Sequence, residues 1–163
     1  GGSFGYNRNE SLADYESSDA LIHMLIEKVA RGGNLLLDIG PAADGTIPVI
    51  MQQRLADIGK WLKTNGEAIF ETTPGKPASG NGVYFTQKNR DLYILLTTKM
   101  DKPLSIDLAR APSKASLLGT NKKPGFSYKN GKLTINPLEL YPNLPSGGSA
   151  WVIKLEGVLE AGK

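Results

Sequence analysis

The residue of this sequence best suited to chemistry is Glu10, which ends the segment Tyr6-Asn7-Arg8-Asn9-Glu10. Amide and guanidinium groups hydrogen-bond the hydroxyls of a sugar, and an aromatic face packs against the C–H side of the sugar ring. A carboxylic acid beside them can hold a proton near neutral pH and deliver it to a departing glycosidic oxygen. The segment is therefore typical of a carbohydrate site with one acid.

Simpler interpretations of Glu10, and of a second acid, Asp38, stay open. Glu10 is one of 16 acidic residues and could be a solvated loop side chain. Asp38 is a second candidate, but a structural carboxylate that accepts hydrogen bonds from nearby loop amides explains it as well. Asn9-Glu10-Ser11 also matches the N-glycosylation pattern. Because a glycan there would crowd the sugar site, we interpret that match as accidental.

Other kinds of site find little support in the residues. The chain has no cysteine, which excludes a disulfide scaffold, a thiolate zinc site and a cysteine nucleophile. The single histidine, His23, lies off the apolar stripe of a predicted helix, so a solvated side chain is favoured over a catalytic triad or a metal ligand. No glycine-rich phosphate loop follows a strand, and the acids lack the spacing of a calcium loop. We therefore expect no metal and no organic cofactor.

Composition and charge narrow the class of protein further. The 163 residues are 40% hydrophobic and 21% charged, which is typical of a globular chain. The net charge of +3 is dispersed, so nucleic acid is not an expected partner. No apolar run approaches the roughly 20 residues of a membrane span, so no membrane is expected either. The chain opens on Gly1-Gly2 and not on Met or a signal peptide, so we expect a piece of a longer protein.

The helices and strands that must position these residues can be predicted from the spacing of apolar residues, which changes along the chain. Apolar spacing predicts helices over 18–31 and 48–65. The continuous apolar run 35–39 between them predicts a strand covered on both faces, as in a parallel sheet or barrel. After about residue 74, six or seven short strands at regular spacing indicate a β-sandwich. The strongest hairpin signal among them is Asn130-Gly131.

Several motifs occur in a fixed order along the chain. They are Ser3-Phe4-Gly5-Tyr6-Asn7-Arg8-Asn9-Glu10, Gly32-Gly33-Asn34-Leu35-Leu36-Leu37-Asp38-Ile39-Gly40-Pro41 and Asp44-Gly45-Thr46-Ile47-Pro48, with shorter ones over 59–69 and 151–155. Together they closely resemble the C-terminal third of the α-L-fucosidases of glycoside hydrolase family 29. The resemblance is dense over residues 3–70 and thins across the predicted strands.

The resemblance implies a fold that periodicity alone does not reach. Residues 1–72 would be an α/β segment, the last part of a catalytic (β/α)8-like barrel, and residues 73–163 an all-β sandwich domain. Strand 35–39 would be the final barrel strand. Because active sites of such barrels lie at the C-terminal ends of the strands, the Glu10 loop would lie at the barrel mouth. The N-terminal part of the barrel would then be a partner of this chain.

The resemblance also implies a reaction, the hydrolysis of terminal α-L-fucose from glycans by a retaining, double-displacement mechanism. Such enzymes use two carboxyls about 5–5.5 Å apart. Glu10 matches the general acid/base, whereas nothing in the chain matches the nucleophile, so the chain alone is expected to be inactive. Tyr6 and Arg8 would line the mouth. Leu35 would approach the C6 methyl of fucose, although core packing explains that side chain equally well.

Two positions depart from the family pattern. Phe4 stands where relatives commonly have Trp, and Asp38 where they commonly have Asn, which leaves substrate preference open.

Two rival interpretations of the chain also stay open. One rival is a non-catalytic sandwich module that binds glycans through aromatic side chains. Its candidates are Tyr84, Tyr93, Tyr128 and Tyr141, for which core or turn positions are favoured. The other rival is a degenerate member that binds fucose without cleaving it. The resemblance also implies a periplasmic or secreted bacterial protein.

Overall fold

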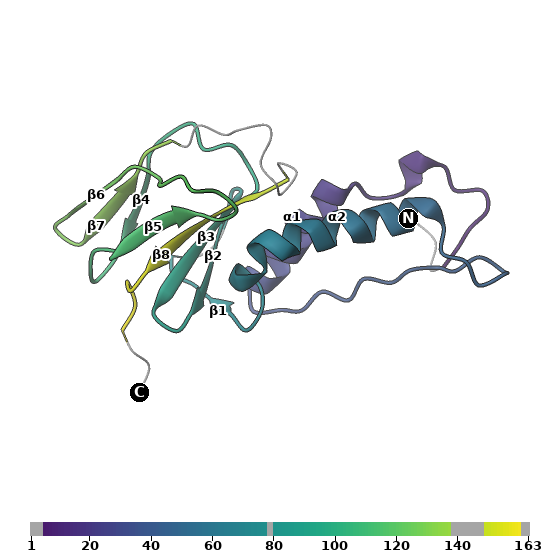
Figure 1. The fold of residues 1–163 in the computed structure, drawn as a ribbon, viewed down its shortest axis with the longest axis horizontal. Coiled ribbons are helices and arrows are strands. Elements are labelled where there is room, and N and C mark those ends of the chain that lie inside the picture. The colour runs from purple at the N-terminus through teal and green to yellow at the C-terminus, as the bar shows by residue number, and fades with distance from the viewer. Residues whose placement is uncertain (1–4, 78–79, 138–148, 161–163) are drawn as a thin grey trace.

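A computed structural model describes residues 5–77, 80–137 and 149–160 of the chain. Two helices lie side by side at one end of a domain built from two β-sheets (Figure 1). In chain order the elements are η1 (Leu12–Asp14), α1 (Ser18–Ala30), α2 (Val49–Asn65), η2 (Gly66–Ala68), β1 (Thr73–Pro74), β2 (Val83–Lys88), β3 (Asp91–Leu96), β4 (Leu104–Asp107), β5 (Lys114–Leu117), β6 (Phe126–Lys129), β7 (Lys132–Ile135) and β8 (Trp151–Glu156).

Both predicted helices are confirmed, and local residues explain their ends. The Ser17 hydroxyl caps α1 by accepting a hydrogen bond from the amide three residues further on, at 3.1 Å. After α1 the chain reverses through Gly32, whose φ of +84° favours glycine. Helix α2 follows Pro48, whose fixed φ suits the entry to a helix. Among the described residues, no helix is both long enough and apolar enough to cross a membrane.

The predicted strand at 35–39 is wrong for this structure. Residues 34–40 form no strand, and the side chain of Leu36 is 86% exposed. A strand exists only where a neighbouring strand completes its backbone hydrogen bonds, and no described strand pairs with this segment. The apolar run therefore lies beside the helices without the ladder that the pattern requires. The barrel part of the predicted fold stays a prediction.

The predicted all-β part is observed as two antiparallel sheets. Their strand orders are β1-β2-β3-β8-β5 and β4-β7-β6. Apolar side chains of both sheets, such as Ile94 and Leu133, form one buried core between them. The Asn130-Gly131 hairpin is confirmed, because both residues take the positive φ that its tight turn requires. Strands β1 and β5 are only two and four residues long, too short for a clear pattern in the sequence.

The helices pack on the outer face of the larger sheet, so β3 and β8 are covered on both faces. A second core joins Ile22, Ile26 and Trp61 of the helices to Tyr93 and Val152 of the sheet. Trp61 is fully buried, and its indole Nε1 donates a hydrogen bond to the carbonyl of Ala150 at 3.1 Å. The domain boundary after residue 72 stays a prediction, but a shared buried core spans that position.

His23 differs from its sequence interpretation. Its side chain is half-buried, and its Nε2 forms a hydrogen bond of 2.7 Å with the carbonyl oxygen of Ser149. The Ser149 hydroxyl in turn donates to the carboxylate of Asp19 in the first turn of α1. The histidine is therefore a structural contact between α1 and the residues that enter β8, and not a solvated side chain.

Candidate active site

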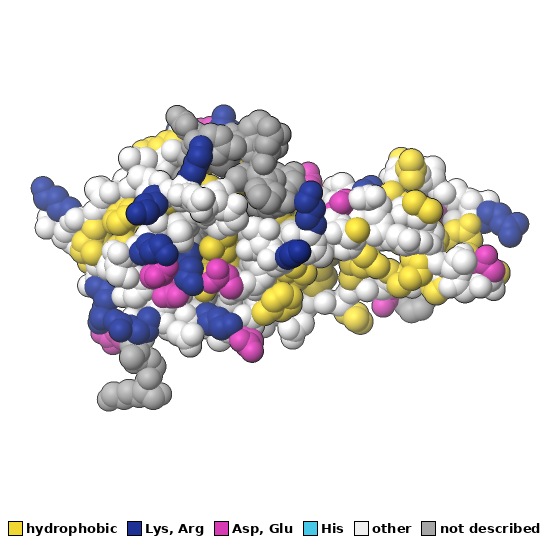
Figure 2. All heavy atoms as spheres, in the orientation of Figure 1, with side chains coloured by type: hydrophobic (Ala, Val, Ile, Leu, Met, Phe, Trp, Pro, Cys, Tyr) yellow, Lys and Arg dark blue, Asp and Glu magenta, His cyan; other side chains and the backbone are white. Residues whose placement is uncertain are grey.

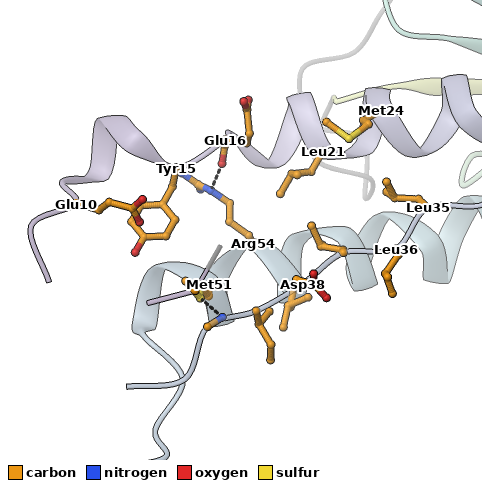
Figure 3. A pocket seen from close by; sticks show the side chains of 15 residues that line it. Glu10, Tyr15, Glu16, Leu21, Met24, Leu35, Leu36, Asp38, Met51 and Arg54 are labelled. Carbon is orange, nitrogen blue, oxygen red and sulfur yellow. Dashed lines mark hydrogen bonds between the residues drawn. The ribbon is translucent and has the colours of Figure 1, made fainter. Parts of the chain in front are cut away.

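A pocket of about 350 Å3 lies between the N-terminal loop, α1, α2 and the segment 35–40. Figure 3 shows Glu10 beside Tyr15 at one end of it, with Leu35 and Leu36 toward the other end. The lining residues are Gly5, Glu10, Tyr15, Glu16, Leu21, Met24, Leu35, Leu36, Leu37, Asp38, Ile39, Gly40, Met51, Arg54 and Leu55. Its walls are therefore largely aliphatic, with a few ionisable side chains.

Gly40 brings the two chain segments of the pocket together. A Cβ atom at this position would overlap the backbone nitrogen of Tyr6 and the backbone of Gly5. Only glycine allows this approach, so the start of the N-terminal loop lies directly against the end of the 35–40 segment. The backbone N–H of Gly40 also donates to the sulfur of Met51 at 3.4 Å. That contact ties the segment to α2.

Two small turns fix the backbone on either side of Glu10. Before it, the Glu10 amide donates to the carbonyl of Asn7 at 3.1 Å, and the Asn7 side chain accepts from the Asn9 amide at 3.0 Å. After it, the carboxylate of Asp14 accepts hydrogen bonds from the amide and the hydroxyl of Ser11, at 2.7 and 2.8 Å. These bonds to Ser11 lower the pKa of Asp14. Glu10 thus sits half-buried between two internally bonded turns.

Tyr15 lies beside Glu10 at one end of the pocket (Figure 3). Partial burial raises the pKa of the Tyr15 phenol, and the neighbouring side chain of Glu10 raises it further. Glu10 acts in this direction because its negative charge would repel a phenolate. The phenol is therefore protonated at neutral pH.

Arg54 of α2 secures the chain just after Tyr15. Its Nε donates to the carbonyl of Glu16 at 2.8 Å, and one terminal nitrogen approaches the Ser18 hydroxyl at 3.4 Å. That hydroxyl donates to the carboxylate of Asp57 at 2.5 Å. The pKa of Asp57 is lowered, chiefly by this bond and also by one from Gln53. The start of α1 and the middle of α2 are thus joined by a small polar network.

The structure brings some of the predicted site residues together and leaves others outside the pocket. Glu10 and Leu35 line it, as does Asp38, the second candidate acid. Arg8 is exposed and does not line it. Tyr6 is 42% exposed and is not a lining residue, although it lies near enough to Tyr15 to raise the pKa of that phenol. Phe4 falls outside the described residues.

Tyr15 and Arg54 are the site residues that sequence reasoning missed. Tyr15 lies in a loop with no periodic signal, five residues after the acid. Arg54 is one of several polar residues on a helix whose pattern identifies only the apolar side. Within the described ranges, no group of three or more His, Cys, Asp or Glu side chains is arranged to hold a metal ion.

The tyrosines named for a glycan-binding module are structural where the chain is described. Tyr93 is buried, and its hydroxyl donates to Glu67 at 3.0 Å. The hydroxyl of Tyr128 donates to the carbonyl of Leu108 at 2.9 Å. Tyr84 is half-buried against the helices. Tyr141 lies outside the described residues.

Comparison with known proteins identifies similar proteins along nearly the whole chain. Residues 1–67 match the family model described as "Alpha-L-fucosidase". The chain is similar to the α-L-fucosidase of Branchiostoma floridae, with 34% identity over 96% of this chain and 36% of the relative. It is 38% identical to tissue α-L-fucosidase of Bos taurus, over 96% of this chain and 35% of that protein.

Solved structures agree with this similarity. The α-fucosidase of Thermotoga maritima, solved in complex with fucose, superposes with a TM-score of 0.74 at 28% identity. The match covers 93% of this chain and 37% of that one. The chain thus spans about a third of the length of the relatives it matches, which are glycoside hydrolases. Over nearly its whole length the chain therefore resembles a C-terminal portion of the α-L-fucosidases of glycoside hydrolase family 29.

Proposed function

We propose that this chain is the part of a retaining α-L-fucosidase that supplies the general acid/base, Glu10. One observation supports this role above the others. Glu10, which the family motif identifies, lines a partly apolar pocket together with Leu35 and Asp38 of the segment that the resemblance assigns to the last part of the barrel. Aliphatic walls beside carboxyl groups suit a deoxy sugar, since fucose presents a methyl group at C6 as well as hydroxyls.

The proposed reaction has two steps. A carboxylate from the remainder of the protein attacks the anomeric carbon, and the glycosidic bond breaks as Glu10 gives its proton to the departing oxygen. The fucosyl–enzyme ester then opens when Glu10, now a carboxylate, takes a proton from the attacking water. Glu10 ends the cycle protonated, and released fucose keeps its anomeric configuration.

The pocket in this chain would be one side of the complete site. Several aliphatic side chains around it are exposed, and Figure 2 shows apolar atoms spread along the helical end of the molecule. The exposed set includes Met24, Leu36, Leu37, Ile39, Val49 and Leu55. Apolar surface of this kind marks an interaction site, and we infer that the N-terminal part of the catalytic barrel covers it. That part would also supply the nucleophile.

The alternative of a free-standing glycan-binding sandwich is less well supported. Its described tyrosines are used in the core or bonded to backbone, so they offer no exposed aromatic platform within the described ranges. The sandwich instead supports the helices through the core around Trp61. We propose that it braces the acid/base segment of the enzyme.

The proposal is tested with the complete reading frame that contains this chain. Wild type, Glu10→Ala and Glu10→Gln are assayed on two α-L-fucosides, one with a good phenolic leaving group and one with a sugar leaving group. General-acid assistance is worth about 10²–10⁴-fold, and it matters most where the departing oxygen is a poor leaving group. Glu27→Ala is the matched control, because Glu27 is an acid on α1 that does not line the pocket and pairs with Arg31 at the surface.

The expected result is a large loss of kcat/KM on the sugar substrate and a much smaller loss on the aryl substrate. Added azide should restore turnover of the aryl substrate by Glu10→Ala, because a small anion can replace water without needing a base. Equal losses on both substrates, with no rescue by azide, would instead make Glu10 a binding or structural residue.

A further inference from the structure

We infer that the outer face of the smaller sheet is a docking surface for a sulfated polysaccharide that carries the fucosyl groups to be removed. This role rests on the proposed function, because it assumes that the complete protein cleaves fucosylated glycans, and it adds the chemical class of the glycan. The surface, called the polar face below, consists of six residues of β4, β6 and β7: Ser105, Asp107, Ser127, Lys129, Lys132 and Thr134.

The polar face follows from the alternation of side chains along the three strands. Leu133 and Ile135 of β7 are fully buried in the core between the two sheets, so the residues that alternate with them point away from that core. The strand register sets these outward residues in two rows across the sheet. One row is Asp107, Lys132 and Lys129, and the other is Ser105, Thr134 and Ser127.

This face is open in the described part of the chain. The helices pack on the outer face of the larger sheet, and Figure 1 shows β4, β6 and β7 on the side of the sandwich away from them. Every residue of the polar face is exposed except Thr134, which is half-buried. A long ligand therefore has access to both rows.

Lys129 and Lys132 lie directly opposite each other on this face. They close the two-residue turn at Asn130-Gly131, so their side chains project side by side from neighbouring strands. Like charges in this arrangement destabilise a sheet. Asp107 offsets only part of that repulsion, because it lies 4.0 Å from Lys132 and both side chains are largely exposed. Within the described ranges Lys129 has no acidic partner, so an anion bound between the two ammonium groups would remove the repulsion.

The charge of the surrounding domain also favours an anion. Residues 73–163 hold 13 of the 19 lysines and arginines but only 6 of the 16 acids, a net charge of +7, whereas residues 1–72 carry −4. In Figure 2, Lys and Arg side chains gather over the sandwich. Arg110 comes two residues after Leu108, whose backbone N–H donates to the Gly131 carbonyl at 2.8 Å. A third cation thus lies on the chain that passes the hairpin turn, and the domain as a whole attracts polyanions.

The residue types favour a sulfated polysaccharide over other polyanions. A sulfate ester has several terminal oxygens, so it can accept hydrogen bonds from both lysine ammonium groups at once. The row of hydroxyls beside the lysines can exchange hydrogen bonds with sugar hydroxyls, and those of Ser105 and Thr134 already lie 3.1 Å apart. The six residues include no aromatic side chain on which a nucleic-acid base would stack, and no apolar side chain that would enter a lipid bilayer.

Docking on the polar face would act on substrate binding and not on bond breaking. A polymer held there raises the effective concentration of its own fucosyl ends at the pocket. Loss of the face should therefore raise KM for a sulfated polymer and leave its kcat unchanged. A small aryl fucoside cannot bridge the two places, so its kinetics should not change.

The test is calorimetric titration of the complete protein with a fucan sulfate and with the same fucan after chemical removal of its sulfate groups. At about 0.1 M salt, Lys129→Gln combined with Lys132→Gln should weaken binding of the fucan sulfate about tenfold or more. The desulfated fucan should bind wild type no better than the fucan sulfate binds this variant. Asp107→Asn removes the one negative charge of the polar face, so it should tighten binding about two- to fivefold.

Lys99→Gln combined with Lys102→Gln is the matched control. Both lysines are exposed and precede β4 in the same domain, and Lys99 lies 3.5 Å from Asp101. The control therefore removes the same net charge, again with one lysine beside an aspartate, but from outside the polar face. It should weaken binding less than about threefold. Thermal melting of both double variants should match wild type, because only exposed side chains are changed.

Titrations in wild type and in Glu10→Gln separate this docking surface from the proposed function. If the leaving-group assays reject Glu10 as the acid/base while the two lysines still govern sulfate-dependent binding, the surface stands and the proposed function fails. Equal affinity for the sulfated and desulfated fucans, or equal losses in the two double variants, would overturn the docking surface. So would binding to polygalacturonate, duplex DNA or phosphatidylserine vesicles that is as tight as binding to the fucan sulfate.

Discussion

The two tryptophans of the chain offer a sharp test of how the helices are attached to the sheet. Trp61 is fully buried between helices and sheet, and its Nε1 donates to the Ala150 carbonyl. Trp151 is half-buried, and its Nε1 is a buried donor with no hydrogen-bond partner in the described structure. Substitution by phenylalanine therefore removes a hydrogen bond at Trp61, whereas at Trp151 it removes a buried donor that has no partner in the described structure.

The expected magnitudes follow from these contacts. Trp61→Phe leaves the Ala150 carbonyl without its donor, which costs about 1–3 kcal/mol, and a residual cavity adds about 1 kcal/mol. Trp151→Phe loses some packing but also removes an unsatisfied buried donor, so the two effects largely offset. We expect a loss of about 2–4 kcal/mol at Trp61 and of less than about 1 kcal/mol at Trp151.

Native-state hydrogen exchange on the complete protein is the assay, because it reports the free energy of local opening without assuming two-state unfolding of several domains. Amides of 49–65 should lose protection in Trp61→Phe and keep it in Trp151→Phe. Equal losses in the two variants, or a larger loss in Trp151→Phe, would refute the reasoning about the two indole donors.

Three further predictions use other contacts of the structure. Burial and a hydrogen bond to Glu67 raise the pKa of Tyr93 to about 12, so its contribution to stability is complete below pH 10 and lost as the pH rises to about 12. Tyr93→Phe should remove that part of the alkaline decline seen in unfolding curves. Glu10→Gln should lower the pKa of the Tyr15 phenol, measured by ultraviolet difference titration with Tyr15→Phe as the blank; an unchanged pKa would deny the contact. Gly40→Ala should reduce kcat/KM at least about tenfold on both fucosides, because its methyl group displaces the backbone beside it, and wild-type kinetics would contradict that packing.

The predicted elements that depend on local chemistry are those that the structure confirms. Helix α1 begins at a serine cap and ends before glycines, which are signals within a few residues of each end. The β6–β7 hairpin depends on Asn130-Gly131, whose positive φ values are set by the turn itself. Such features need no information about the remainder of the chain.

Two apolar runs with similar sequence patterns have different structures, which shows that a local pattern is not enough to predict a strand. Residues 35–39 and 92–96 are both largely apolar runs, a pattern typical of a strand covered on two faces. The second run is β3, a strand with hydrogen-bonded neighbours on both sides and cores on both faces. The first has no described strand beside it, and Leu36 is exposed. A ladder is formed between distant segments, so an apolar run alone cannot establish that its partners are present.

The candidate site likewise has features that the sequence predicts and features that only the fold determines. The sequence by itself predicted the candidate acid, since Glu10 lies in a contiguous motif of sugar-binding residue types, and it predicted the resemblance to α-L-fucosidases that the comparisons support. Only the tertiary structure decided which side chains surround that acid. Tyr15, Arg54 and the 35–40 segment come together because Gly40 admits the backbone of the N-terminal loop and because two helices are joined through Ser18. These contacts join residues up to 39 positions apart, a separation that no local pattern can encode.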